Sequence, residues 1–210
     1  MPSGSDDSKA VAAVASAGPA SKAALTAAAP AAAASATAAA PAEQGPLGAG
    51  VKLLTLVIPH IGGHLLLGKK LRGFGEGYFN GFGGKVEPGE TIEASARREL
   101  LEEAHITATT MEHAGVLHFV FDDKPLPWEV HVLRVTGFEG TPAASDEMEP
   151  LWFRPEDVPY ENMWADDVFW YPLFLSGKLF RGTFHFKDTH TLVEHTLEEV
   201  QQLHLPSEPL

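Results

Sequence analysis

The 210-residue chain contains no cysteine, which excludes disulfide frameworks, thiolate metal sites and cysteine nucleophiles. It also lacks any run of roughly 18 uninterrupted apolar residues, so we expect a soluble protein with no membrane partner. Basic residues are scarce: 15 Lys and Arg against 28 Asp and Glu give a formal net charge of −13. A nucleic-acid polymer needs a basic face, so we expect no such partner. A small phosphorylated ligand remains compatible with this charge if divalent cations stand between carboxylates and phosphates.

The first fifty residues have few bulky or charged side chains and consist mostly of alanine, proline, serine and glycine. With so little to bury, residues 1–50 are predicted to be a disordered tail and residues 51–205 a single domain. An organelle-targeting peptide is the alternative, but the tail has no arginine and carries the acidic pair Asp6 and Asp7. We expect a cytoplasmic location, with the nucleus and mitochondria as alternatives.

The pattern of apolar residues after residue 50 predicts a mixed sheet covered by two helices. Strands are predicted at residues 52–59, 65–69, 115–121, 130–138, 151–153, 179–186 and 191–197. Helices are predicted at 91–104 and 166–176, with a short helical turn at 155–158 and a glycine-dense loop at 73–89. This order of elements predicts an α/β fold, specifically an α/β/α sandwich.

Three glutamates share one face of the first predicted helix. Glu99, Glu102 and Glu103 stand at i, i+3 and i+4, where like charges repel by roughly a few tenths of a kcal/mol per pair. They also lie near the negative end of the helix dipole. A sequence that accepts both penalties suggests a bound cation, and Mg²⁺ commonly uses a few carboxylates plus substrate phosphates. The alternative is a solvated acidic helix.

The loop before this helix can support the same site. Its glycines allow a tight path that brings backbone N–H groups and Glu90 against the carboxylate face. Arg98 can pair with one of the glutamates and fix its orientation. The glycines concerned are Gly81, Gly83, Gly84 and Gly89.

The whole segment is more specific than the glutamates alone. It consists of Gly84, five residues, Glu90, seven residues, and then Arg98-Glu99-Leu100-x-Glu102-Glu103-x-His105-Ile106. It resembles the Nudix signature at every defined position except His105, where the signature has glycine. That glycine normally ends the helix in a left-handed conformation. Histidine tolerates this conformation at a cost on the order of 1 kcal/mol, so we expect an effect on helix termination and not on the carboxylates.

Residues 52 to about 200 also resemble one branch of this superfamily, the animal-type MutT homologues, which are oxidised purine nucleoside triphosphatases. The resemblance is carried by residues 72–75, 140–148 and 164–167. It implies the Nudix α/β/α sandwich and hydrolysis of 8-oxo-dGTP and 2-hydroxy-dATP to the monophosphate and pyrophosphate, which keeps damaged bases out of DNA. The implied cofactor is Mg²⁺, with Mn²⁺ as a substitute. Nothing in the sequence demands more than a monomer.

The resemblance also assigns roles to individual residues. Glu99 and Glu103 are the implied principal metal ligands, and Glu102 is a ligand or the general base. Glu147 is a further ligand from a facing loop, and Gly84 a backbone contact near the metal. The residues implied in substrate binding, with Lys70 on the phosphate side, are Thr55, Lys70, Asn80, Phe119, Trp164, Asp166 and Asp167. Phe74, Phe121, Met148 and Phe186 are implied as pocket neighbours, and Trp128 stands where the resemblance leads us to expect methionine.

The adjacent acids Asp166 and Asp167 suit base recognition. If burial and mutual repulsion raise the pKa of one carboxyl so that it keeps its proton, the pair offers both a donor and an acceptor. The alternative is a plain helix N-cap. Similarly, Phe119 and Phe121 alternate on a strand and would ordinarily be core residues on one face, so their role in the pocket rests on the resemblance. His190 and His195 have no ligand spacing and are expected to be surface or strand residues.

The sequence is compatible with three functions. The first is hydrolysis of oxidised purine nucleoside triphosphates, favoured by Asn80, Trp164 and the aspartate pair. The second is hydrolysis of another nucleoside diphosphate derivative, such as a nucleotide sugar or a dinucleotide. The third is a non-catalytic nucleotide-binding module. The complete set of helix glutamates argues against the third, because a binding module has no use for their repulsion.

Overall fold

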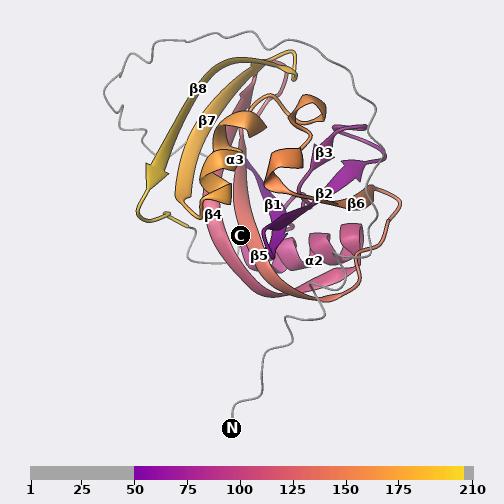
Figure 1. Cartoon of the computed structure of the whole chain (residues 1–210). Coiled ribbons are helices and arrows are strands. Elements are labelled where there is room, and N and C mark those ends of the chain that lie inside the picture. Colours follow the sequence, from indigo (N-terminus) through magenta and orange to yellow (C-terminus); the bar gives the residue numbers. More distant parts are fainter. Residues whose placement is uncertain (1–49, 206–210) are drawn as a thin grey trace.

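The computed structural model describes residues 50–205, so the tail predicted for residues 1–50 lies outside the described part apart from Gly50. The elements follow one another as in Figure 1. The strands are β1 (Lys52–Ile61), β2 (His64–Lys70), β3 (Phe79–Asn80), β4 (Ile106–Phe121), β5 (Trp128–Gly140), β6 (Met148–Phe153), β7 (Leu179–Lys187) and β8 (Thr191–Val200). The helices are α2 (Ile92–Ala104) and α3 (Asp167–Leu175), with 3-10 turns η1 (Pro155–Asp157) and η2 (Tyr160–Asn162).

Within the described residues, the strands form one mixed sheet in the order β3-β2-β1-β5-β4-β7-β8, with β6 paired to β2. β1 runs parallel to β5, and β4 runs parallel to β7, whereas the other pairs are antiparallel. The predicted β1–β2 hairpin is confirmed, and it turns at Gly62 and Gly63, both with positive φ.

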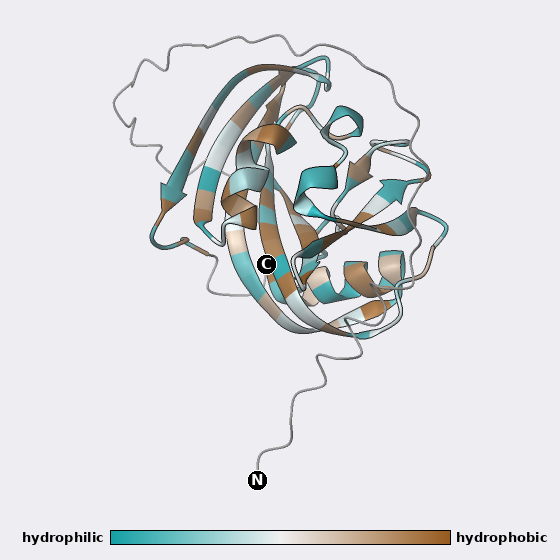
Figure 2. Ribbon diagram, in the orientation of Figure 1, coloured by the Kyte–Doolittle hydropathy of each residue, from teal (hydrophilic) through white to brown (hydrophobic). Residues whose placement is uncertain are grey.

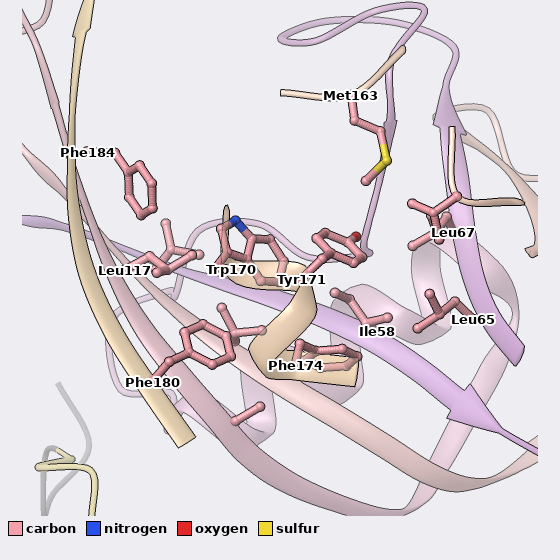
Figure 3. Packing of buried hydrophobic residues seen from close by; sticks show 14 of the residues in the cluster. Ile58, Leu65, Leu67, Leu117, Met163, Trp170, Tyr171, Phe174, Phe180 and Phe184 are labelled. Atoms are coloured by element: carbon pink, nitrogen blue, oxygen red, sulfur yellow. The ribbon is translucent and has the colours of Figure 1, made fainter. Parts of the chain in front are cut away.

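The two helices lie on opposite faces of the sheet. Successive residues of a strand point to opposite faces, so neighbouring strand residues pack against different helices. On β1, Ile58 packs in the cluster that contains α3 residues, while Val57 packs in the cluster that contains α2 residues. Val132 and Leu133 on β5 divide in the same way. Figure 2 shows that the central strands of the sheet are rich in hydrophobic residues, as expected for strands covered on both faces. Figure 3 shows the α3 side of the core, which is filled by the fully buried rings of Trp170, Tyr171, Phe174, Phe180 and Phe184. The predicted α/β/α sandwich is confirmed.

Helix α2 begins and ends where the sequence predicts. Thr91 is its N-cap, and the Thr91 hydroxyl accepts a hydrogen bond from the Ala94 N–H at 3.1 Å. His105 follows the last turn with φ 58°, the left-handed conformation expected at the position where the signature has glycine. The helix therefore ends in the way the signature requires, without glycine.

The structure differs from the sequence-based prediction at β4 and in the glycine-rich loop. β4 begins at Ile106 and not at Gly115, because irregular pairing between Ala108 and Gly115 breaks the alternation by which a strand is recognised. The predicted loop at 73–89 contains the two-residue strand β3, which pairs with β2. Neither described helix is long and apolar enough to cross a membrane.

Candidate active site

The three glutamates of α2 face the glycine-rich loop because the opposite edge of the helix is anchored in the core. Ala96 and Leu100 on that edge are fully buried. Glu103 is only 4% exposed, whereas 60% of the Glu102 side chain is exposed. Glu99 lies between these extremes. The helix thus presents two largely buried carboxylates, those of Glu99 and Glu103, and one exposed carboxylate, that of Glu102.

Arg98 holds the first part of this face in place. Its guanidinium donates to Glu90 at 2.8 and 2.9 Å, to Glu99 Oε1 at 2.8 Å and to Glu102 Oε2 at 3.2 Å. The bonds from Arg98 lower the pKa of Glu90 to about 2. The predicted pairing of Arg98 with a glutamate is therefore present. Gly84 packs directly against Glu99, since a Cβ at Gly84 would lie 2.5 Å from Glu99 Oε1.

Glu103 is held by partners from the loop and from β2. The Gly83 N–H donates to Glu103 Oε2 at 2.9 Å, and Lys70 Nζ donates to Glu103 Oε1 at 3.0 Å. Lys70 also donates to Glu147 at 3.1 Å, and Glu147 accepts a further bond from Arg72 at 2.8 Å. Burial raises the pKa of Glu103, while the Gly83 amide and Lys70 act against that rise. Burial likewise raises the pKa of Glu99.

A groove of about 530 Å³ runs beside this face; the four predicted metal-binding glutamates line it, and Gly84 does not. In the arrangement seen between residues 50 and 205, no three acidic or histidine side chains converge closely enough to hold a metal ion. In this arrangement Arg98 binds Glu99 and Lys70 binds Glu103. The donor set nevertheless fits a hard divalent cation. Sheltered carboxylates with raised pKa values gain from a nearby positive charge, and the exposed Glu102 can turn toward them. The groove is lined by Glu99, Glu102, Glu103, Glu147, Arg72, His105, Ala144, Ser145 and Asp146.

A cavity of about 470 Å³ lies next to the groove, and Arg72 and Glu147 line both. The structure places every predicted substrate residue in its lining: Thr55, Lys70, Asn80, Phe119, Trp164, Asp166 and Asp167. The predicted neighbours Phe74, Phe121, Met148 and Phe186, together with Trp128, line it as well. The cavity therefore combines aromatic and acidic side chains, and it shares Arg72 and Glu147 with the carboxylate groove.

The aspartate pair lines the cavity and is buried. Asp166 is 3% exposed and its Oδ2 accepts a bond from Trp170 Nε1 at 2.9 Å. Asp167 is 2% exposed and accepts from the Trp164 N–H at 3.0 Å. Asp166 occupies the N-cap position of α3, but its side chain makes no capping bond, so capping does not explain it.

Both carboxyl groups of this pair have raised pKa values. Burial raises the pKa of Asp166 to about 6. Burial and the charge of Asp166 raise the pKa of Asp167 well above its usual value. At neutral pH, the two neighbouring carboxyls can therefore hold one proton between them, which makes one a donor and the other an acceptor.

The wall of the cavity is aromatic. Phe74 stacks on Trp164 with ring centroids 4.9 Å apart and lies edge-on to Trp128 at 5.1 Å. Among the aromatic residues of the lining, sequence reasoning missed Tyr78 and Trp170. Trp170 stands four residues after Asp166 on the same helix face, and this spacing could have revealed it. Tyr78 gives no such signal, because the loop of residues 71–78 brings it to the cavity.

The comparisons with known proteins agree with this geometry. A model of the NUDIX domain matches residues 55–174. The chain is 51% identical over 152 residues to the oxidized purine nucleoside triphosphate hydrolase of Danio rerio, covering 72% of this chain and 97% of the relative. It is 44% identical to the protein of that name from Mus musculus, covering 71% of this chain and 96% of the relative.

A solved structure supports the same relationship. The crystal structure of a mutator MutT protein from Bacillus halodurans superposes with a TM-score of 0.63 at 29% identity, over 70% of this chain and 98% of that one. Its fold is therefore shared over nearly its full length. With the signature helix, the sandwich fold and these matches in agreement, the chain belongs to the Nudix hydrolase family.

Proposed function

We propose that this Nudix hydrolase converts oxidised purine nucleoside triphosphates, such as 8-oxo-dGTP and 2-hydroxy-dATP, to the nucleoside monophosphate and pyrophosphate. The observation that carries the proposal is the buried pair Asp166 and Asp167 in an aromatic cavity that opens onto the carboxylate groove. The names of the zebrafish and mouse relatives support the same substrate class.

In the cavity, the base lies against Trp164 and Phe119, and polar groups form hydrogen bonds with its edge. The aspartate pair offers a donor and an acceptor, which suits the altered hydrogen-bonding edges of oxidised purines. Asn80 Oδ1 accepts from the Gly81 N–H at 2.9 Å, so the Asn80 amide NH₂ is the group that can donate to the base. A site built on such hydrogen bonds discriminates strongly against a base that cannot complete them.

At the groove end, Lys70 and Arg72 supply positive charge for the triphosphate. The residues that would hold the proposed Mg²⁺, with Mn²⁺ as a substitute, are Glu99, Glu102, Glu103 and Glu147, with the Gly84 backbone beside them. When bound, Mg²⁺ neutralises phosphate charge and makes a water more acidic.

The proposed reaction is a displacement at the β-phosphorus. The water oxygen forms a bond to that phosphorus, and the bond from the β-phosphorus to the oxygen bridging it to the α-phosphate breaks. The monophosphate then leaves with that oxygen. Glu102, the most exposed of the three helix glutamates, is the candidate that takes the proton of the water if it does not hold the metal. Arg98 orients Glu99 through the bond described above.

The proposed setting is the nucleotide pool of the cytoplasm, with the nucleus and mitochondria as alternatives, and the enzyme is proposed to act as a monomer. No nucleic-acid polymer is a proposed substrate. The test is the initial rate of pyrophosphate release with Mg²⁺ from 8-oxo-dGTP, 2-hydroxy-dATP and dGTP, and of ADP-ribose hydrolysis. A strong preference for the two oxidised purines is expected. Good turnover of ADP-ribose beside poor turnover of both would reject the proposed substrate class.

A further inference from the structure

The turn between β7 and β8 has an unusual backbone. Asp188 and Thr189 follow each other there with φ 52° and 64°, the left-handed region that residues with a Cβ seldom adopt. Two consecutive non-glycine residues in this conformation cost free energy, so they persist only where their surroundings hold them. Such a turn, at the tip of the hairpin in Figure 1, needs a structural reason.

The segment joining β4 to β5 holds this turn in place. Asp122 Oδ1 accepts from the Asp188 N–H at 2.9 Å, and Asp123 Oδ2 accepts from the Thr189 hydroxyl at 2.6 Å. Lys124 Nζ donates to the same hydroxyl at 3.0 Å, and Thr189 is only 8% exposed. Three successive residues of one loop thus bind two successive residues of the other.

The same segment also contacts aromatic rings that line the cavity, although it does not line the cavity itself. Lys124 Nζ lies 5.4 Å from the centroid of Phe74 and 5.3 Å from that of Phe121, and both rings line the cavity. The strained turn is therefore fixed with respect to the cavity, not merely to the surface of the hairpin.

The residue after this turn, His190, packs against the indole of Trp164. The imidazole of His190 lies parallel to the indole of Trp164, with an interplanar angle of 6° and centroids 5.5 Å apart. Tyr78 stands edge-on to both rings, at 5.1 Å from Trp164 and 6.4 Å from His190. His190 itself is exposed and does not line the cavity, so it can affect the substrate only through the rings that do, Trp164 and Tyr78.

We propose that His190 is a positioning residue for base recognition: together with the closer stack of Phe74 on the same indole, the imidazole held by the turn keeps Trp164 in the orientation in which it meets the purine. This inference rests on the proposed function and adds a residue to it. A ring fixed before binding gives up less conformational freedom when the base arrives, which appears as tighter substrate binding. The expectation that His190 would be a surface residue was correct, and from the surface its ring packs against a residue that lines the cavity.

The test compares His190→Ala and His190→Phe with the wild type, using 8-oxo-dGTP as substrate. An aromatic pair contributes modestly, so His190→Ala should raise KM by about two- to tenfold while kcat changes little. His190→Phe restores a stacking ring and should return KM close to the wild-type value. The dissociation constant of 8-oxo-dGMP, measured by calorimetry, should follow KM.

His195→Ala is the matched control. His195 is also an exposed histidine of this hairpin, and it stacks on Phe184 with an interplanar angle of 4°, yet it does not line the cavity. Its replacement should leave KM unchanged. An unchanged KM in His190→Ala, or a His190→Phe variant as weak as His190→Ala, would overturn the positioning role. A wild type that does not prefer 8-oxo-dGTP over dGTP would instead reject the proposed function.

Discussion

Replacing Asp166 by asparagine should stabilise the fold at neutral pH while it weakens base recognition. Asp166 is 3% exposed, and burial raises its pKa from 3.8 to about 6. A difference of roughly two between folded and unfolded pKa values corresponds to about 3 kcal/mol. Asparagine has a similar shape and no charge, so it escapes this cost.

The direction of the pH dependence follows from the raised pKa. Between pH 3.8 and about 6 the folded protein holds more protons at Asp166 than the unfolded chain does. Stability therefore falls as the pH rises through this window, and the full cost is present above it. The Asp166→Asn variant should gain nothing well below the window and most above it.

The expected gain at neutral pH is about 1–3 kcal/mol, because part of the 3 kcal/mol is offset if the bond from Trp170 becomes weaker. For a domain of this size, that gain corresponds to a rise in Tm of about 2–12 °C. Thermal unfolding followed by circular dichroism at about pH 7.5 and about pH 4 measures it. Asp157→Asn, at an exposed site, is the control and should change Tm little at either pH. A loss of stability at pH 7.5, or an equal gain at both pH values, would show that the buried charge of Asp166 does not destabilise the fold.

Three further predictions concern the groove and the cavity. Glu103→Gln should keep the fold by circular dichroism but lower kcat by about a hundredfold or more, because it removes charge from the proposed metal site; near-normal turnover would contradict that role. Gly84→Ala puts a Cβ 2.5 Å from Glu99 Oε1, so Glu99 must move and kcat should fall by about ten- to a hundredfold; an unchanged kcat would mean that the position of Glu99 is unimportant. Trp170→Phe removes the hydrogen bond that lowers the pKa of Asp166, so the acidic limb of the pH profile of kcat/KM for 8-oxo-dGTP should move to higher pH. If the limb does not move, the ionisation of Asp166 does not affect binding of the base.

Helix α2 and its glutamates could be predicted from sequence because their determinants are local. Thr91 caps the helix three residues before its bonding partner, and the face of Glu99, Glu102 and Glu103 follows from helical spacing alone. Even the left-handed His105 could be placed, because the position follows the last helical turn. An element whose contacts lie within one continuous segment can be predicted from the sequence of that segment.

The contacts that shape the groove could not be predicted in this way. Lys70 meets Glu103 across 33 residues of sequence and Glu147 across 77, and only the pairing of β2 with β6 and the packing of α2 bring them together. The stack of His190 on Trp164 likewise depends on the backbone of a turn that has no glycine to mark it. Such contacts are properties of the assembled sheet.

The most direct test of the whole account is the ratio of kcat/KM for 8-oxo-dGTP to that for dGTP in three proteins: the wild type, Asp167→Asn and Glu102→Gln. If the aspartates recognise the base and the glutamates perform the hydrolysis, Asp167→Asn should lose most of the ratio while it still hydrolyses dGTP. Glu102→Gln should be slow on both substrates with the ratio preserved. A ratio that survives in Asp167→Asn would contradict the account, because the base would then be recognised elsewhere.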